Sequence, residues 1–178
     1  MKKIGTFIII FLLFAGCDSI NNSPTRRVEE FFNSYQTLDD KLLNNLDYSI
    51  ESNELNEEEK NTYREIMTRQ YRDLTYIIKD EEIDGDNAIV KVEIEVYDYS
   101  KSISEASDYF MLHQDEFLDD SLMVSKEKYI DYKLELMKKN KERVKYTLSI
   151  TLSKKDNKWI MDDISDSDRE KIHGIFTY

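Results

Sequence analysis

The chain has 178 residues, of which 37 are acidic and 25 are basic, and its formal net charge is −12. A chain of this length can bury about two-thirds of its unfolded surface in one core, so we expect a single domain. The acidic balance argues against nucleic acid as a partner, because proteins approach nucleic acid through basic patches. Cys17 is the only cysteine, which excludes a disulfide within the chain.

The first residues have the pattern of a secretory leader. Lys2 and Lys3 precede an apolar run over residues 6–15, as in a signal peptide. A helix of about ten residues spans roughly 15 Å, half of the ~30 Å hydrocarbon core of a bilayer. We therefore interpret residues 1–16 as a signal peptide and not as a membrane span.

The leader ends in Phe14-Ala15-Gly16-Cys17, which resembles the lipobox of bacterial lipoproteins. That resemblance implies cleavage between Gly16 and Cys17 and attachment of a diacylglyceryl group to the Cys17 thiol. A thiolate is the side chain that readily displaces a lipid donor, and two acyl chains suffice for stable anchoring. The prediction is a lipid-anchored protein on the extracytoplasmic face of the cell membrane, with residues 17–24 as lipidated cysteine and polar tether before a domain at 25–178.

Two helices are predicted next. Ser23 can cap a helix with Pro24 in its first turn, and apolar residues recur at spacings of three and four through Leu46, so one long helix is expected. A second helix begins near Asn56, with Glu59 three residues later as in a capping box.

The period then changes to two. Strands are predicted at 75–83 and 88–99 around a tight turn, and at 144–153 and 158–164 around a second turn. Alternation in the longest strand separates one face that is apolar from one that is polar, as in an antiparallel sheet with one wet face; the apolar residues are Ala88, Val90, Val92, Ile94 and Val96.

Helices are also expected between and after these strands. Ser102 with Glu105 predicts a helix from 102 to about 117, and a second one spans about 125–142. Ser167 with Glu170 predicts a short final helix that ends near Gly174.

This layout resembles the NTF2-like cone fold, which many small lipoproteins of low-GC Gram-positive bacteria share. The residues that carry the resemblance are Gly85-Asp86-Asn87-Ala88 with the strand that follows, and Lys158-Trp159-Ile160. It implies an α+β fold in which N-terminal helices pack on a curved antiparallel sheet and leave a pocket. The helical stretch at 102–142 departs from that pattern and is interpreted as an insertion that covers or fills the pocket mouth.

No catalytic constellation is present, and we expect a non-catalytic domain that binds a small molecule or a protein, without a cofactor. The cone-fold resemblance implies an alternative, an isomerase with a carboxylate among apolar neighbours, for which only Asp98 continues the inner strand face. His113 and His173 are interpreted as surface or partly packed residues, and Trp159 as a core anchor. An accessory solute-binding protein is a third possibility, although two-lobed binding proteins need a longer chain.

Acidic clusters could be mistaken for metal sites. Asp119 with Asp120 is interpreted as part of a loop, and the run that begins at Asp162 and ends at Asp168 as helix-capping charge. The turn at 84–87 lacks the later glutamate of a calcium loop. We therefore expect no metal.

Aromatic residues gather near the predicted junction of the long strand and the following helix. Tyr97, Tyr99 and Tyr109, with Phe110, are the candidates for a partner surface, because tyrosines are frequent where proteins meet. The alternative is that they pack under the helical insertion.

Overall fold

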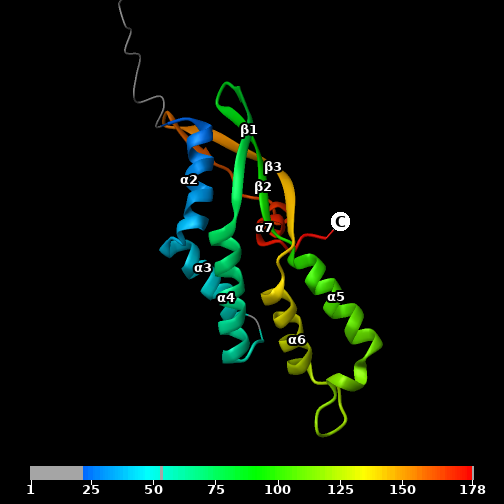
Figure 1. Ribbon diagram of the computed structural model, residues 1–178. Helices are drawn as coiled ribbons and strands as arrows, with labels where there is room; N and C mark the ends of the chain where they lie inside the picture. Colours follow the sequence, from blue (N-terminus) through cyan, green and yellow to red (C-terminus); the bar gives the residue numbers. More distant parts are fainter. Residues whose placement is uncertain (1–21, 53, 178) are drawn as a thin grey trace, which may run out of the picture.

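The computed structural model describes residues 22–52 and 54–177 (Figure 1). Residues 1–16, Cys17 and most of the predicted tether therefore lie outside the described residues. In chain order the elements are α2 (Pro24–Thr37), α3 (Asp40–Glu51), α4 (Glu57–Asp73), β1 (Thr75–Asp84), β2 (Asn87–Tyr97), α5 (Tyr99–Leu112), a 3-10 turn (Gln114–Phe117), α6 (Lys126–Lys139), β3 (Arg143–Lys155), β4 (Lys158–Met161) and α7 (Asp166–His173).

The strands form one antiparallel sheet in the order β1-β2-β3-β4, which confirms the predicted α+β class. The sheet stays open, and its register shifts between Ile78 and Asp80 in β1, where an extra residue forms a β-bulge. Gly85 has a φ of 59° in the two-residue turn between β1 and β2, as the first central residue of a type II′ turn requires.

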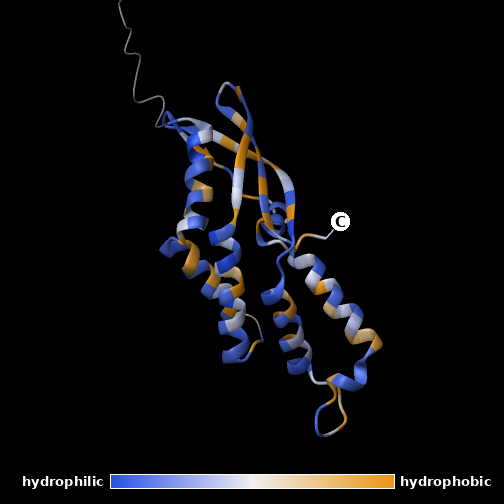
Figure 2. Cartoon of the chain, viewed as in Figure 1, coloured by the Kyte–Doolittle hydropathy of each residue, from blue (hydrophilic) through white to orange (hydrophobic). Residues whose placement is uncertain are grey.

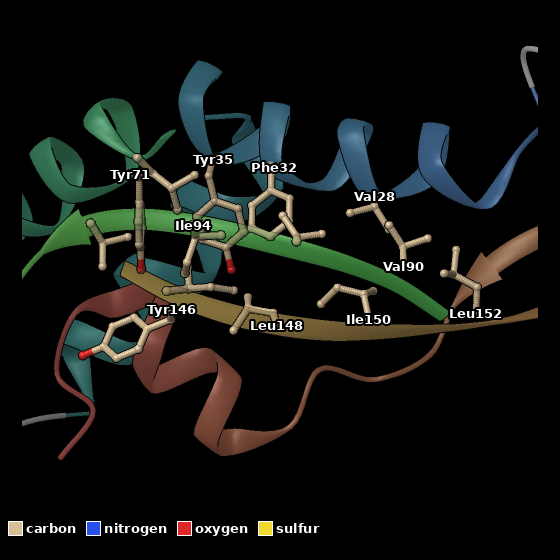
Figure 3. Packing of buried hydrophobic residues seen from close by; sticks show 14 of the residues in the cluster. Val28, Phe32, Tyr35, Tyr71, Val90, Ile94, Tyr146, Leu148, Ile150 and Leu152 are labelled. Atoms are coloured by element: carbon tan, nitrogen blue, oxygen red, sulfur yellow. The ribbon is translucent and has the colours of Figure 1, made fainter. Parts of the chain in front are cut away.

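The inner face of the sheet forms the main core. In β2 the five predicted inward residues are all at most 3 % exposed, and they face α2 and α4. Figure 3 shows Val28 and Phe32 of α2 over Val90 and Ile94, with the inward residues of β3 beside them. Strict alternation in β2 and β3 thus places one apolar row of each strand under the helices.

The outer face is wet, as predicted. Glu93 of β2 lies 3.3 Å from the Nζ of Lys79 and 3.5 Å from that of Lys145 on the two neighbouring strands. Lys91 pairs with Glu82 at 2.8 Å. Exposed pairs of this kind contribute little to stability, and their main effect is to keep this face soluble.

The prediction of one long N-terminal helix is wrong, because the helix is interrupted at Leu38. Leu38 adopts a left-handed conformation with φ 55°, and the Asp39 carboxylate accepts a 2.7 Å hydrogen bond from the Leu42 backbone to start α3. The apolar stripe continues across the break, so its period does not reveal it. The predicted caps at Ser23 and Asn56 are confirmed, the latter with its complete capping box.

Two other predicted helix starts are also wrong. Asp98, and not Ser102, caps α5, and β2 therefore ends at Tyr97. Ser165, and not Ser167, caps α7 after β4 has ended at Met161. In each case the helix begins earlier than predicted, and the cap accepts from the backbone N–H three positions on, because the first N–H groups of a helix lack helical partners.

Helices α5 and α6 form a hairpin that projects from one end of the sheet beside α4 (Figure 1). A second apolar cluster holds it there, with Ile66 of α4, Tyr99 of α5 and Leu134 of α6 among its members. This confirms a helical segment between β2 and β3. No helix in residues 22–52 and 54–177 has the length and apolar character needed to cross a membrane.

Gln70 of α4 joins three elements through its fully buried amide. Its Oε1 accepts a 2.9 Å hydrogen bond from the Tyr97 backbone, and its Nε2 donates to the carbonyls of Tyr97 and Ile172, both at 3.3 Å. Gly174, with φ 72°, ends α7 directly against this amide. The position has no room for a side chain.

We expect Gly174→Ala to destabilise the fold by about 3 kcal/mol or more, through the left-handed backbone and a clash of the new Cβ with the Tyr97 carbonyl and the Gln70 amide. Gly85→Ala is the matched control, since Gly85 has a similar φ but open space around it, and should cost about 1 kcal/mol. Urea unfolding measures both. Equal losses would contradict the close packing at Gly174.

Candidate ligand-binding site

A pocket of about 250 Å³ lies where α2, α3, α4 and α7 meet. It combines apolar, hydroxyl and basic side chains from four helices; these are Tyr35, Leu42, Asn45, Leu46, Ser49, Tyr63, Met67, Tyr71, Arg169 and His173. Its volume lies just below the usual range of about 300–1,000 Å³ for ligand sites. We call it the Tyr71–His173 pocket.

The floor of the pocket is aromatic. The ring of Tyr71 meets that of Tyr35 edge-on at 5.0 Å between centroids, and lies 5.7 Å from the His173 ring. The Tyr71 hydroxyl is 3.2 Å from His173 Nε2, so the phenol can donate to the imidazole when Nδ1 carries the proton. Residues that are 102 positions apart in the chain thus form one hydrogen-bonded pair.

Burial fixes the protonation states in this pocket. It raises the pKa of Tyr71 well above its usual range, and it also raises the pKa of Tyr35 and of Tyr63. Burial, together with the smaller effect of the positive charge of Arg169, lowers the pKa of His173 to about 4. At neutral pH the phenols keep their protons and the imidazole is uncharged, so Arg169 carries the charge of the pocket.

This chemistry suits binding. The residues described as lining the pocket include no carboxylate, and a neutral histidine of low pKa is a weak base at pH 7. The pocket offers hydrogen bonds from phenols and one guanidinium at an apolar floor. This lining could hydrogen-bond one polar or anionic group of a small organic molecule.

The helical hairpin takes no part in this pocket. We expected the segment between β2 and β3 to cover or fill a pocket mouth, but none of the described lining residues comes from α5 or α6. The hairpin packs against α4 at the end of the sheet instead.

Asp98, the candidate pocket carboxylate, lies outside the pocket. Its Oδ1 accepts hydrogen bonds from the Ser100 hydroxyl at 2.6 Å and from the Lys101 backbone at 3.2 Å. It serves as the N-cap of α5 at the end of β2, and the inner-face alternation stops at Val96. The catalytic interpretation of Asp98 therefore gains no geometric support.

The candidate partner tyrosines occupy two places. Tyr97 stacks on Tyr99 at 5.9 Å, and its ring lies between the guanidinium groups of Arg69 and Arg143, at 4.4 and 4.9 Å. Tyr99 is fully buried and its hydroxyl accepts from Arg69 at 3.0 Å. These contacts correspond to the packed alternative, in which the tyrosines support the helical hairpin.

Tyr109 lies farther along α5, away from that junction. Its ring stacks on His113 at 4.2 Å and on Tyr132 of α6 at 5.0 Å, and its hydroxyl donates to Glu116. A role of Tyr97, Tyr99 and Tyr109 in partner contact stays a prediction.

A group of exposed apolar side chains lies at the end of the hairpin. Five of them lie in or beside the loop that joins α5 to α6, and each is more than half exposed; they are Met111, Leu112, Leu122, Met123 and Val124. Figure 2 shows this loop as the apolar end of the hairpin. Sequence reasoning missed it, because the residues carry no periodic pattern.

The remaining predicted residues behave as loop and core. Asp119 accepts hydrogen bonds from the backbones of Ser121 and Met123, as expected of a turn. Trp159 is 7 % exposed at the end of the sheet, which confirms it as an anchor. Within the described ranges no group of three or more His, Cys, Asp or Glu side chains could hold a metal ion.

Comparison with known proteins gives little further guidance. No protein-family model matches the chain, and no curated protein matches it. Among solved structures, a crystal structure described as a lipoprotein of Bacillus subtilis subsp. subtilis str. 168 matches with 14 % identity and a TM-score of 0.42. The match covers 92 % of this chain and 51 % of that protein, so the chain spans about half of its length.

His173 should make the stability of the fold depend on pH. Because its pKa is about 4 in the folded state and about 6.5 in the unfolded chain, its contribution is present above pH 6.5 and is lost as the pH falls toward 4. Between pH 7 and pH 5, the free energy of unfolding should fall by up to about 2 kcal/mol more in wild type than in His173→Gln. Denaturant titrations at both pH values measure this difference.

The control is His113→Gln, which removes a half-exposed histidine at the end of α5 and should retain the wild-type response to pH. If His173→Gln also retained the full response, the assignment of a buried neutral imidazole would be wrong.

Proposed function

We propose that this chain is a lipid-anchored extracytoplasmic lipoprotein whose domain binds a small organic molecule in the Tyr71–His173 pocket. The anchor rests on the sequence, where a basic and apolar leader ends in Phe14-Ala15-Gly16-Cys17. The observation that carries the binding role is the pocket itself, with protonated phenols, a neutral imidazole and one guanidinium over an apolar floor.

The start of the described chain supports attachment near one end of the domain. Asn22 donates a 2.7 Å hydrogen bond to the Asn157 carbonyl and accepts one from the Trp159 backbone, so the chain joins the domain beside the turn between β3 and β4. The five residue steps from Cys17 to Asn22 can span at most about 18 Å. A Cys17 anchor would therefore hold this end close to the membrane.

A second candidate role, protein binding, is favoured by the exposed apolar end of the hairpin. In Figure 1 this loop lies at the opposite end of the molecule from the start of α2. With the anchor at Cys17, the loop would point away from the bilayer, where a protein could reach it. Clustered apolar side chains of this size are common at contact sites.

We also propose that the domain is a variant of the NTF2-like cone fold. The features that support this are the N-terminal helices on the inner face of the sheet, the long β1–β2 hairpin and the bulge that bends β1. The hairpin of α5 and α6 is then an addition at the end of the sheet. We propose a non-catalytic role, because Asp98 is engaged as a helix cap and the described pocket lining lacks a carboxylate.

The anchor is tested by metabolic labelling of the full-length protein with an alkyne analogue of palmitate in a bacterial host. Wild type should take up the label and enter the detergent phase of a Triton X-114 partition, whereas Cys17→Ser should lose the label and stay uncleaved. Ser19→Ala keeps the thiol and should behave as wild type. Labelling of Cys17→Ser at the wild-type level would overturn the proposed anchor.

The pocket is tested by blocking it from an exposed position. Asn45→Trp should fill the mouth from α3, whereas Asn44→Trp, the neighbouring residue outside the pocket lining, is the matched control. Native mass spectrometry of full-length protein purified gently from cells should show an added mass in wild type and Asn44→Trp that Asn45→Trp loses. A bare mass in all three proteins would contradict a stably occupied pocket.

A further inference from the structure

A second cavity, of about 190 Å³, lies where α4 meets the helical hairpin. Its walls are mostly apolar and include Ile103 of α5, Leu134 and Met137 of α6, and Ile175 after α7, while Tyr63 of α4 lines both this cavity and the Tyr71–His173 pocket. One charged side chain lines it, Lys133 of α6.

Lys133 differs from every other lysine on its helix. Lys126, Lys138 and Lys139 each pair with a glutamate at 3.0 Å or less, and Lys128 donates to the Leu118 carbonyl at 2.6 Å. Among the described residues Lys133 forms no ion pair and no hydrogen bond, and its Nζ lies 5.7 Å from the centre of the Tyr129 ring. A half-buried ammonium group is therefore left without a counter-ion at an apolar cavity.

Among the described residues no carboxylate forms an ion pair with Lys133, although the charge of Glu59 acts on it. Burial lowers the pKa of Lys133, and the charge of Glu59 opposes the shift only in part. The Glu59 carboxylate is itself buried and already accepts a 2.6 Å hydrogen bond from the Asn56 backbone in the capping box of α4. Because the ammonium group is half-buried, it has lost part of its hydration, and an anion that reached it in the cavity would gain an ion pair.

We propose that this cavity binds a small monocarboxylate with a short hydrocarbon tail. The carboxylate pairs with Lys133 Nζ, and the tail lies between Ile103, Leu134 and Met137. At about 30 Å³ for each water-sized group, the cavity holds roughly six such groups, the carboxylate included, so a short-chain acid matches its volume. This site does not depend on the Tyr71–His173 pocket or on the lipid anchor.

The test is equilibrium dialysis of radiolabelled hexanoate against the full-length protein in detergent, with detergent alone as the blank. Wild type should show one saturable site. Lys133→Met should bind hexanoate about tenfold more weakly or worse, because it removes the charged partner and keeps the apolar wall. Lys139→Met, which removes an exposed lysine of the same helix, should bind as wild type does.

Two further measurements keep the result interpretable. Ile103→Phe narrows the cavity and retains Lys133, so it should also lose hexanoate, while circular dichroism confirms that each variant is folded. Unlabelled hexan-1-ol has the tail without the charge and should compete about tenfold less well than unlabelled hexanoate. The proposal is overturned if wild type shows no saturable site, if Lys133→Met binds like wild type, or if the alcohol competes as well as the acid.

Discussion

The buried amide of Gln70 is the constraint on which the arrangement of the domain depends. An amide in an apolar core must find partners for both its donor and its acceptor atoms, and Gln70 finds them on the last residue of β2 and on α7. This fixes where the central strand ends relative to α4, and it brings the C-terminal end of α7 onto the same point. Because His173 follows Ile172 directly, the amide that holds the Ile172 carbonyl also places His173 opposite Tyr71. The Tyr71–His173 pocket therefore depends on the hydrogen bonds of the Gln70 amide.

The same strand end also positions the helical hairpin. Tyr97, the residue that Gln70 holds, also has the guanidinium groups of Arg69 and Arg143 over its ring, and Asp98 then caps α5. Arg69, the neighbour of Gln70 on α4, donates to the carbonyls of Met137, Lys138 and Asn140 at the C-terminal end of α6, where a positive charge also suits the helix dipole. Two adjacent residues of α4 thus hold the hairpin where it joins the sheet: Gln70 at the start of α5 and Arg69 at the end of α6. The cavity at Lys133 exists because the two helices leave the sheet from this fixed base.

Alternation predicted the sheet because burial on one face forces a period of two, and each inward residue of β2 was identified from sequence. Helix boundaries were harder to predict. Leu38 belongs to the apolar stripe, whose period indicates a continuous helix. Its left-handed backbone ends the helix at the same residue. At α5 and α7 several residues could cap, and only the position of the preceding strand end decides among them. The pocket escaped prediction because Tyr35, Tyr63 and Tyr71 have the spacing of an ordinary core stripe. Their function as pocket lining depends on His173, about a hundred residues later, and no local pattern joins the two segments.

Both cavities carry one cation and, among their described lining residues, no carboxylate, in a protein whose net charge is −12. The overall field of such a protein slows the approach of anions, and salt screens that field beyond about 10 Å. At contact distance the local charge dominates for Lys133, which is half-buried at an apolar cavity, whereas Arg169 is exposed and lies 3.9 Å from Asp166. For a ligand with several negative charges, the repulsion by the net negative charge of the protein would exceed the attraction to one guanidinium or ammonium group. One cation at each cavity and a negative net charge are therefore consistent with the proposed ligands of single negative charge, and they disfavour polyanions such as nucleic acid.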